Sequence, residues 1–299
     1  MSEFLRSRTL HATPLVQITD FSCRAPASSC GGEECASSHH VLFTRAGVFV
    51  KHAAGRRVVA ESTHALFFNH REPFRVSHPL PGGDECTIVS CPVSIWLELV
   101  GHYDAAVIDR PDAPFMRSHG SLAPRTLLRS RQLPHRVRRG HMEVLEVEEE
   151  TLDLLDAVLG DTYGGRDSLR FGATARTASR RRELAEQTKL QIAASPADNR
   201  SLLDLARAVN SSPFHLSRVF RQRVSMSIHQ YRLRLRLALA LDRLLESSES
   251  LSGMAHALGF SSHSHFTTVF RRTFGVSPSA FRRARSSTRV TELRTNLQA

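Results

Sequence analysis

The stretch HLSRVFRQRVSMSIHQYR, residues 215–232, returns fifty positions later as HFTTVFRRTFGVSPSAFR, residues 265–282. Aligned, the two copies share six identical residues, and an aromatic residue occupies both Tyr231 and Phe281. The identical positions are His215/His265, Val219/Val269, Phe220/Phe270, Arg221/Arg271, Ser227/Ser277 and Arg232/Arg282. Chance rarely repeats both spacing and chemistry, so the C-terminal half contains a duplicated helical unit.

Each copy follows a short apolar segment, SLLDLA at 201–206 and SLSGMA at 250–255. Ser201 fits a helix N-cap, with Asp204 as a short-armed version of the capping box, and Pro213 fits the start of the next helix. We therefore predict that each unit is a short helix, a tight turn and a second helix. The helices predicted in this half lie at about 180–194, 201–209, 213–224, 228–245, 250–258, 262–274 and from 278 onward.

This order of elements is the helix-turn-helix pattern, in which the outer face of the second helix contacts base edges. Ala206 and Ala255 are small enough to let the paired helices cross closely. The candidate DNA-binding residues are Pro213, Phe214, Ser217, Arg218 and Arg221 in the first unit, and His263, Ser264, Thr267, Thr268, Arg271 and Arg272 in the second. The longer helix at 228–245 would join the two units as a rigid bar about 27 Å long.

Arg218 is the strongest candidate for reading a base, because its guanidinium matches O6 and N7 of guanine. The arginines near the helix C-termini are placed for phosphate contact, with a solvated helix face as the alternative for each. They are Arg221, Arg223, Arg271 and Arg272. His215 and His265 share the repeat register with core positions, so we expect them to pack or cap rather than to contact DNA.

The excess of positive over negative charge lies entirely in the half that holds the repeat. Residues 171–299 carry 21 Lys/Arg against 8 Asp/Glu, whereas residues 1–170 carry 19 against 21. Such an asymmetry favours a polyanionic partner, with nucleic acid ahead of a membrane surface.

With these residues in view, the chain resembles the AraC/XylS-type transcription regulators over about residues 182–285. The resemblance is carried by SLxxLAxxVxxSPxHLSRxFR and MAxxLGFSSxSHFTxVFRRTFGVSPxxFR. It implies seven helices with two helix-turn-helix units, and an N-terminal cupin-like β-domain that senses a signal or dimerises. Two departures matter: Thr268 stands where the family usually has Arg, and Ser225 stands where it usually has Gly. We therefore expect the second unit to read bases more weakly.

The N-terminal half agrees with this expectation through short β-branched and aromatic runs separated by turns, which favour an antiparallel sandwich or small barrel. Strands are predicted around 15–19 and at 41–53, 56–60, 64–70, 74–78 and 86–91, and helices at 123–139, interrupted by Pro134, and at 142–159. The predicted class is α+β. Its parts are a cupin-like sensor or dimerisation domain at 1–165, a linker at 166–180, an AraC-type DNA-binding domain at 181–286 and a disordered tail at 287–299.

Cys23, Cys30, Cys35 and either His39 or His40 could supply a tetrahedral zinc site. Their spacing is irregular and lacks a CxxC, so a loop with unligated thiols is the alternative, and no other cofactor is expected. The HxH…E…H set of metal-dependent cupin enzymes is absent from the sequence, so we predict no catalytic residue. The turn-rich stretch HPLPGGDECT at 78–87 is the predicted rim of a small-effector pocket.

The sequence lacks an apolar run long enough for a membrane span and an apolar targeting segment at its start. With five cysteines and no export signal, we expect a cytoplasmic protein without disulfides or membrane contact. The leading hypothesis is a sequence-specific transcription regulator that binds double-stranded DNA, with a small-molecule effector, RNA polymerase and a second copy of the chain as further candidate partners. One alternative is a DNA-repair alkyl-acceptor protein, although Cys91-Pro92 lacks the His-Arg of a PCHR motif. The other is a nucleoid binder whose affinity follows salt and not sequence.

Overall fold

The computed structural model describes residues 4–24, 31–140, 142–164 and 175–284. Its N-terminal half contains two antiparallel sheets that face each other. The six-stranded sheet has the order β1 (Leu5–Ala12), β2 (Gln17–Cys23), β9 (Asp84–Ser90), β4 (His40–Gly47), β7 (His64–Phe68) and β10 (His119–Ser121). The four-stranded sheet has the order β3 (Glu34–Cys35), β8 (Pro73–Ser77), β5 (Phe49–Ala53) and β6 (Arg56–Ala60).

The central strands are buried on both faces, and their side chains alternate between two cores because the side-chain period of a strand is two. On β4, Val41 and Phe43 pack toward the helices, whereas Leu42 packs between the sheets. On β7, Phe67 joins the helix-side core and Phe68 joins the inter-sheet core. The larger sheet therefore lies between the smaller sheet and a layer of helices.

Helices follow the sheets along the chain. The helices of the N-terminal half are α1 (Val93–Gly101), a 3-10 turn η1 (Ala105–Asp109), α2 (Pro124–Arg138) and α3 (Val144–Tyr163). Those of the C-terminal half are α4 (Ala175–Ala194), α5 (Leu202–Ala208), α6 (Pro213–Val224), α7 (Ile228–Glu246), α8 (Leu251–Ala257), α9 (His263–Phe274) and α10 (Pro278–Ala284). Within the described residues, no helix combines the length and apolar composition that crossing a membrane requires.

Several details differ from the sequence-based expectation. The run predicted at 41–53 forms two strands, β4 and β5, which belong to different sheets. The single strand predicted around 15–19 is a hairpin, because β1 pairs in antiparallel register with β2. Helix α2 continues through Pro134, since the packing of Leu128 and Leu133 in the core offsets the one hydrogen bond that proline removes. Helix α4 begins at Ala175, five residues before the predicted start. The predicted tail at 287–299 lies outside the described residues.

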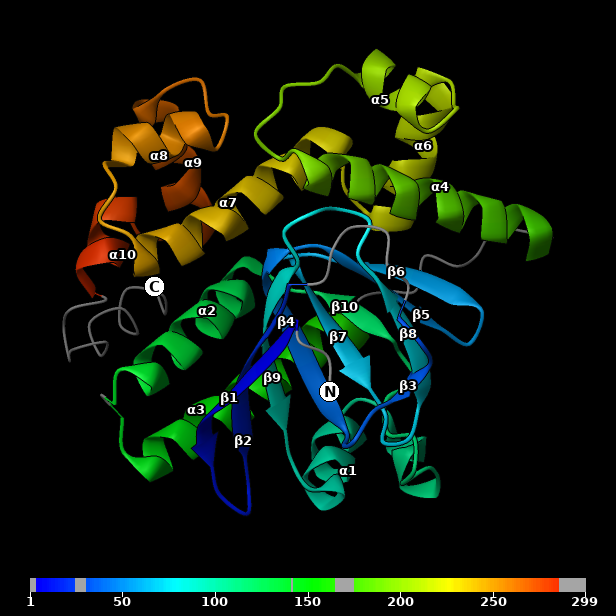
Figure 1. Ribbon diagram of the computed structural model, residues 1–299, viewed down its shortest axis with the longest axis vertical. Coiled ribbons are helices and arrows are strands. Elements are labelled where there is room, and N and C mark those ends of the chain that lie inside the picture. The colour runs from blue at the N-terminus through cyan, green and yellow to red at the C-terminus, as the bar shows by residue number, and fades with distance from the viewer. Residues whose placement is uncertain (1–3, 25–30, 141, 165–174, 285–299) are drawn as a thin grey trace.

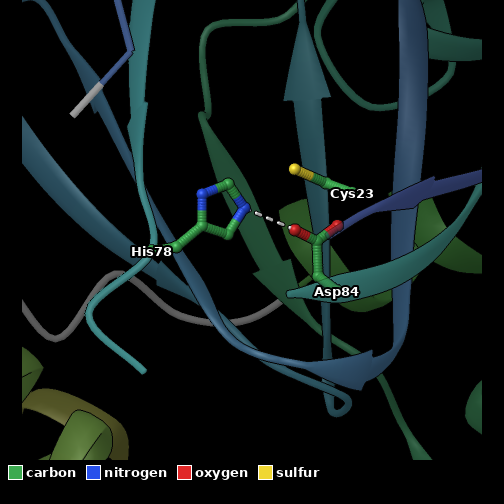
Figure 2. Close-up of side chains that lie close together, drawn as sticks. All are labelled: Cys23, His78 and Asp84. Atoms are coloured by element: carbon green, nitrogen blue, oxygen red, sulfur yellow. Dashed lines mark hydrogen bonds and ion pairs between the residues drawn. The ribbon is translucent and has the colours of Figure 1, made fainter. Parts of the chain in front are cut away.

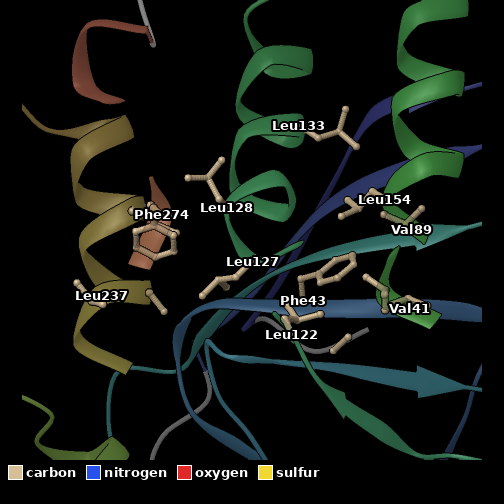
Figure 3. Packing of buried hydrophobic residues seen from close by; sticks show 14 of the residues in the cluster. Val41, Phe43, Val89, Leu122, Leu127, Leu128, Leu133, Leu154, Leu237 and Phe274 are labelled. Atoms are coloured by element: carbon tan, nitrogen blue, oxygen red, sulfur yellow. The ribbon is translucent and has the colours of Figure 1, made fainter. Parts of the chain in front are cut away.

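One hydrophobic core joins the larger sheet to the C-terminal helices (Figure 3). Helix α2 lies in the middle of it: Leu127 packs toward Phe43 of the sheet, and Leu128 toward Leu237 of α7 and Phe274 of α9. All of these side chains are at most 7% exposed. The second helix-turn-helix unit is therefore anchored to the N-terminal half by apolar packing.

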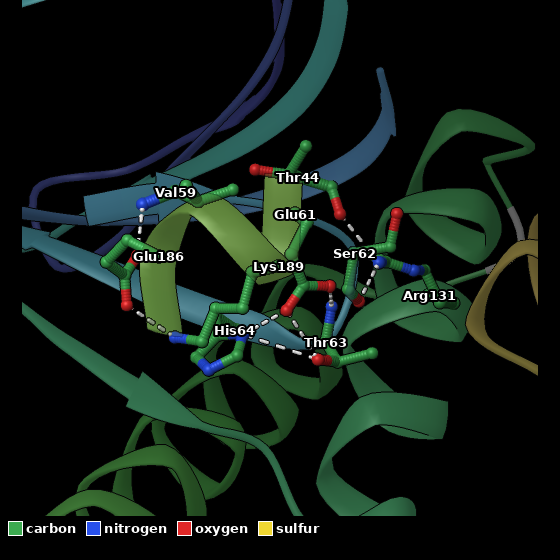
Figure 4. Close-up of polar contacts among 9 residues, drawn as sticks. All are labelled: Thr44, Val59, Glu61, Ser62, Thr63, His64, Arg131, Glu186 and Lys189. Atoms are coloured by element: carbon green, nitrogen blue, oxygen red, sulfur yellow. Dashed lines mark hydrogen bonds and ion pairs between the residues drawn. The ribbon is translucent and has the colours of Figure 1, made fainter. Parts of the chain in front are cut away.

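A second core anchors the first unit in a similar way. Leu216 and Phe220 of α6 are completely buried in a cluster that includes Val50 and Val59 of the smaller sheet. Helix α4 lies at this junction, where the Glu186 carboxylate accepts hydrogen bonds from the Val59 amide (2.8 Å) and from Lys189 Nζ (2.9 Å) (Figure 4).

Buried polar groups complete the contact between the two halves. The Arg131 guanidinium, only 2% exposed, donates hydrogen bonds of 2.7 Å to the carbonyls of Thr44 and Ser62 (Figure 4) and forms an ion pair at 3.2 Å with Asp242 of α7. Burial raises the pKa of Asp242 to about 6 even though the positive charge of Arg131 opposes the shift. The N-terminal half thus holds α7 through a buried charge as well as through apolar contacts.

Candidate nucleic-acid interface

The two helix-turn-helix units are built by matching local signals. In the first, Ser201 and Asp204 form the predicted capping box at the start of α5, and the Ser212 hydroxyl accepts a hydrogen bond from the His215 amide (3.2 Å) at the start of α6. In the second, Ser250 caps α8 and Ser262 caps α9. These serines satisfy amide groups that a helix leaves without intrahelical partners, so the short helices begin at defined residues.

The tight turns also match. Each contains one residue in the left-handed region, Asn210 (φ 49°) in the first unit and Gly259 (φ 77°) in the second. The following amide donates back to the alanine of the preceding helix: Ser211 to the Ala206 carbonyl (2.9 Å) and Phe260 to the Ala255 carbonyl (3.0 Å). Since both alanines are buried, the predicted close helix crossing is present in both units.

The candidate DNA-binding residues lie on the outer sides of α6 and α9. Eight of them are exposed: Phe214, Arg218, Arg221, His263, Ser264, Thr268, Arg271 and Arg272. The other three, Pro213, Ser217 and Thr267, are half-buried. Phe214 is 77% exposed at the first turn of α6, which is unusual for a large apolar side chain. Both second helices therefore present accessible polar faces, with the apolar anchors Phe220 and Phe270 completely buried beneath them.

Arg223 was predicted to contact phosphate, and its surroundings are different from those of Arg221. It is half-buried and lines a cavity of about 110 Å³ beside Arg182 and Glu186 of α4. Burial and the nearby charge of Arg182 lower its pKa. The Arg223 side chain thus faces the junction with α4, while Arg221 remains exposed.

The two repeated histidines have exposed side chains. The His265 ring lies edge-on to Phe260, with centroids 5.7 Å apart, and its Nδ1 lies 3.0 Å from the Ser261 hydroxyl. His265 therefore packs against Phe260 at the surface, and neither histidine lies in the core, contrary to what their repeat register suggested. His215 contributes its backbone amide to the Ser212 cap.

Arg236 of α7 is a residue whose role the sequence did not indicate. It is 6% exposed and donates to the carbonyls of Pro196 (2.6 Å), Ala197 (3.0 Å) and Asp198 (3.3 Å), which precede α5. It also donates to the Asn199 side chain (3.0 Å) and to the Gly259 carbonyl (2.7 Å) in the turn of the second unit. One guanidinium therefore connects the segment before α5 to the turn of the second unit. It does so from α7, the helix that runs between the two units (Figure 1).

The residues proposed for zinc from the sequence do not come together among those described. Cys35 is exposed on β3, whereas His40 is buried, stacks on Phe68 at 4.7 Å and has a pKa lowered to about 4 by burial. His39 Nδ1 accepts a hydrogen bond from the His70 amide. Cys30 lies outside the described residues, and Cys23 lies instead beside His78 and Asp84.

Comparison with known proteins concerns the C-terminal region. A family model described as a helix-turn-helix domain matches residues 205–284. The HTH-type transcriptional activator RhaS of Pectobacterium carotovorum is 42% identical over 67 residues, which are 22% of this chain and 24% of that protein. Regulatory protein PocR of Salmonella typhimurium is 35% identical over 86 residues, 29% of this chain and 28% of that protein.

A solved transcriptional regulator from Chromobacterium violaceum, of the AraC-type DNA-binding-domain proteins, matches 37% of this chain and 97% of its own, with 29% identity and a TM-score of 0.34. This chain spans only about a quarter of the length of the curated relatives cited above. The matches in sequence agree with the structure, which has two capped units with exposed second helices. Residues 205–284 are therefore a helix-turn-helix domain of the AraC/XylS type.

Proposed function

We propose that the whole chain is a sequence-specific transcription regulator that binds double-stranded DNA through α6 and α9. The observation that carries the proposal is the pair of helix-turn-helix units fixed to one helix, each with an accessible polar face. Recognition helices held in this way can enter successive stretches of the major groove, which recur about 34 Å apart along B-DNA. One chain would then read two adjacent segments.

The two faces carry different side chains at the equivalent position. Arg218 on α6 offers two parallel donors to guanine, while Thr268 on α9 offers one hydroxyl and a methyl group. We therefore assign the greater share of base discrimination to the segment under α6. Phosphate contacts from Arg221, Arg271 and Arg272 would position both helices without specifying sequence.

The N-terminal half would serve as the cupin-like sensor or dimerisation domain of this cytoplasmic, non-enzymatic regulator. In the proposed organisation this domain comprises residues 1–165, residues 166–180 are a linker, and residues 181–286 are the DNA-binding domain. The apolar and polar contacts to α2, α4 and α7 support such a role, because a change in the sandwich would act directly on the helices that hold both units. A small-molecule effector, RNA polymerase and a second copy of the chain remain the proposed partners beyond DNA.

The test uses the full-length protein and duplexes selected by the protein from a random pool. The affinity of the protein for each duplex is measured by fluorescence anisotropy at two salt concentrations. It should be much higher for a selected duplex than for a scrambled duplex of the same composition. Arg218→Ala should weaken binding by about 1–3 kcal/mol and relax base preference in one segment. Arg8→Ala, which removes an exposed arginine from β1, is the charge-matched control and should leave the preference intact.

A specificity ratio near one, with affinity that follows salt alone, would instead identify a non-specific nucleoid binder. Loss of preference at every position in the Arg218→Ala protein would also contradict the proposed assignment, because a base-reading side chain acts on one or two base pairs.

A further inference from the structure

Three side chains with metal-binding atoms meet where β2 and β9 lie side by side (Figure 2). Cys23 ends β2, His78 follows β8, and Asp84 begins β9. The sulfur, imidazole nitrogen and carboxylate oxygen all lie within 4.8 Å of one another. All three residues are buried, each only 5% or 6% exposed.

The backbone places these groups together. Cys23 and Asp84 are directly paired in the β2–β9 ladder, so their side chains point to the same face of the sheet. Between His78 and Asp84 the chain reverses through Gly82 (φ 102°) and Gly83 (φ 73°). A Cβ at Gly83 would collide with the Cys23 carbonyl, so the turn passes close to β2 only because that residue is glycine.

Polar contacts fix the orientation of the Asp84 carboxylate within this cluster. His78 Nε2 lies 2.7 Å from Asp84 Oδ1, and the thiol of Cys86 donates to Asp84 Oδ2 at 3.2 Å. The Cys86 thiol thus orients the Asp84 carboxylate from the side away from His78 Nε2, because each of the two groups contacts a different carboxylate oxygen. A cavity of about 240 Å³, lined by Cys23 and Asp84 among others, adjoins the cluster and has room for water.

We propose that Cys23, His78 and Asp84 bind a zinc ion, with a water molecule from the adjoining cavity as the fourth ligand. One sulfur, one imidazole nitrogen and one carboxylate oxygen are ligands that Zn²⁺ takes in tetrahedral sites with an open position. A thiolate and a carboxylate together balance the charge of the ion, which is what a buried site requires. Binding would release the proton of the Cys23 thiol.

The separation of the His78 and Asp84 ligand atoms is already close to that of a tetrahedral site, and the Cys23 sulfur lies within 4.8 Å of both. Two ligand atoms each about 2.0–2.1 Å from zinc lie about 3.3 Å apart. The His78–Asp84 pair would therefore open by about half an ångström as the ion replaces the hydrogen bond between them, a movement within the reach of side-chain rotation. A zinc ion at this position would be held by the sandwich alone, whether or not the protein binds DNA.

The test uses the full-length protein, stripped with a chelator and titrated with Zn²⁺ or Co²⁺. Zinc should bind with a stoichiometry of one per chain and raise the melting temperature. Cobalt should give the visible bands of a tetrahedral ion and a thiolate-to-metal charge-transfer band in the near ultraviolet. Cys23→Ser should abolish the charge-transfer band, and Cys35→Ser, at an exposed cysteine of the same sandwich, should retain it.

His78→Gln provides a second readout that keeps the thiol in place, and it should weaken zinc binding at least tenfold. Each variant is first compared with the parent protein by circular dichroism and melting without metal, so that a loss of fold is recognised. Absence of one-to-one zinc binding by the parent protein would overturn the proposal. So would a charge-transfer band that survives in Cys23→Ser, or unchanged zinc affinity in a folded His78→Gln protein.

Discussion

Replacing Arg236 by lysine keeps the positive charge on α7 and removes the planar group that joins the segment before α5 to the turn of the second unit. The guanidinium makes five hydrogen bonds, four to backbone carbonyls and one to the Asn199 side chain. At a net value of about 1 kcal/mol each, the set contributes about 5 kcal/mol. Lysine offers donors from a single point and cannot span both sides of the helix, so we expect a loss of about 2–3 kcal/mol.

The first measurement is thermal unfolding of the full-length protein by calorimetry. At about 2–4 °C per kcal/mol for a chain of this order of size, Arg236→Lys should lower the melting temperature by about 5–10 °C. The matched control is Arg243→Lys on the same helix, because Arg243 is exposed and its ion pair with Glu249 is long, at 3.9 Å. Exposed pairs of this kind contribute little, so the control should melt close to the parent protein.

The second measurement is binding to a duplex that contains both recognised segments and to one that contains only the first. The parent protein gains affinity from the second segment because α6 and α9 are held at a fixed separation, and Arg236→Lys should reduce that gain. Equal melting temperatures for the Arg236→Lys and Arg243→Lys proteins, together with an unchanged gain from the second segment, would refute the role given to Arg236.

Three further outcomes follow from single positions. Ser225 has a left-handed backbone (φ 60°), so Ser225→Gly should stabilise the protein by about 1 kcal/mol. Gly275 has a similar backbone (φ 77°), so Gly275→Ser should destabilise the protein by a similar amount. Both effects are measured as shifts of the unfolding midpoint, and shifts of the opposite sign would contradict the backbone argument. Thr268→Arg should increase affinity by about 1–3 kcal/mol for a duplex with guanine at the matching base of the second segment, and an increase that is equal for all bases would argue against base reading. Burial raises the pKa of Asp242 from its ordinary 3.8 to about 6 in the folded protein, so its carboxyl contributes stability that declines as pH rises from about 4 to about 6. Carbon NMR should show this midpoint, Arg131→Met should raise it further, and a midpoint near 4 would disprove the effect of burial.

The helices of the C-terminal half could be predicted from the sequence because their signals are local. Ser201 with Asp204 marks the start of α5, and Pro213 marks the start of α6. The apolar spacing that contains Phe220 and Phe270 identifies the buried faces of α6 and α9. Each signal lies within a few residues of the structure it specifies, so the predicted bounds of α6 and α7 agree with the observed ones to within one residue.

The features that the sequence did not reveal depend on distant contacts. In the stretch YRLRLRL at 231–237, arginines alternate with leucines. The neighbouring residues do not distinguish Arg236, which joins the turn of the second unit to the segment before α5, from the other two arginines. The meeting of Cys23 with Asp84 depends on the register between β2 and β9, which the pattern of either strand leaves open. The DNA contacts themselves remain predictions, because exposure shows only which side chains are accessible.

The unbroken core around α2 has a consequence for how the protein can be dissected. The region that matches the helix-turn-helix family model begins at residue 205. Leu237 and Phe274 of that region share a hydrophobic core with Leu128, which lies outside it. Expressed alone, residues 175–284 would expose those side chains, and we expect the fragment to self-associate. The region that is similar to other proteins is therefore shorter than the region that can fold on its own. If the DNA-binding domain were fused to a different sandwich, that sandwich would have to supply a new apolar surface to cover α7 before the fusion protein could be soluble.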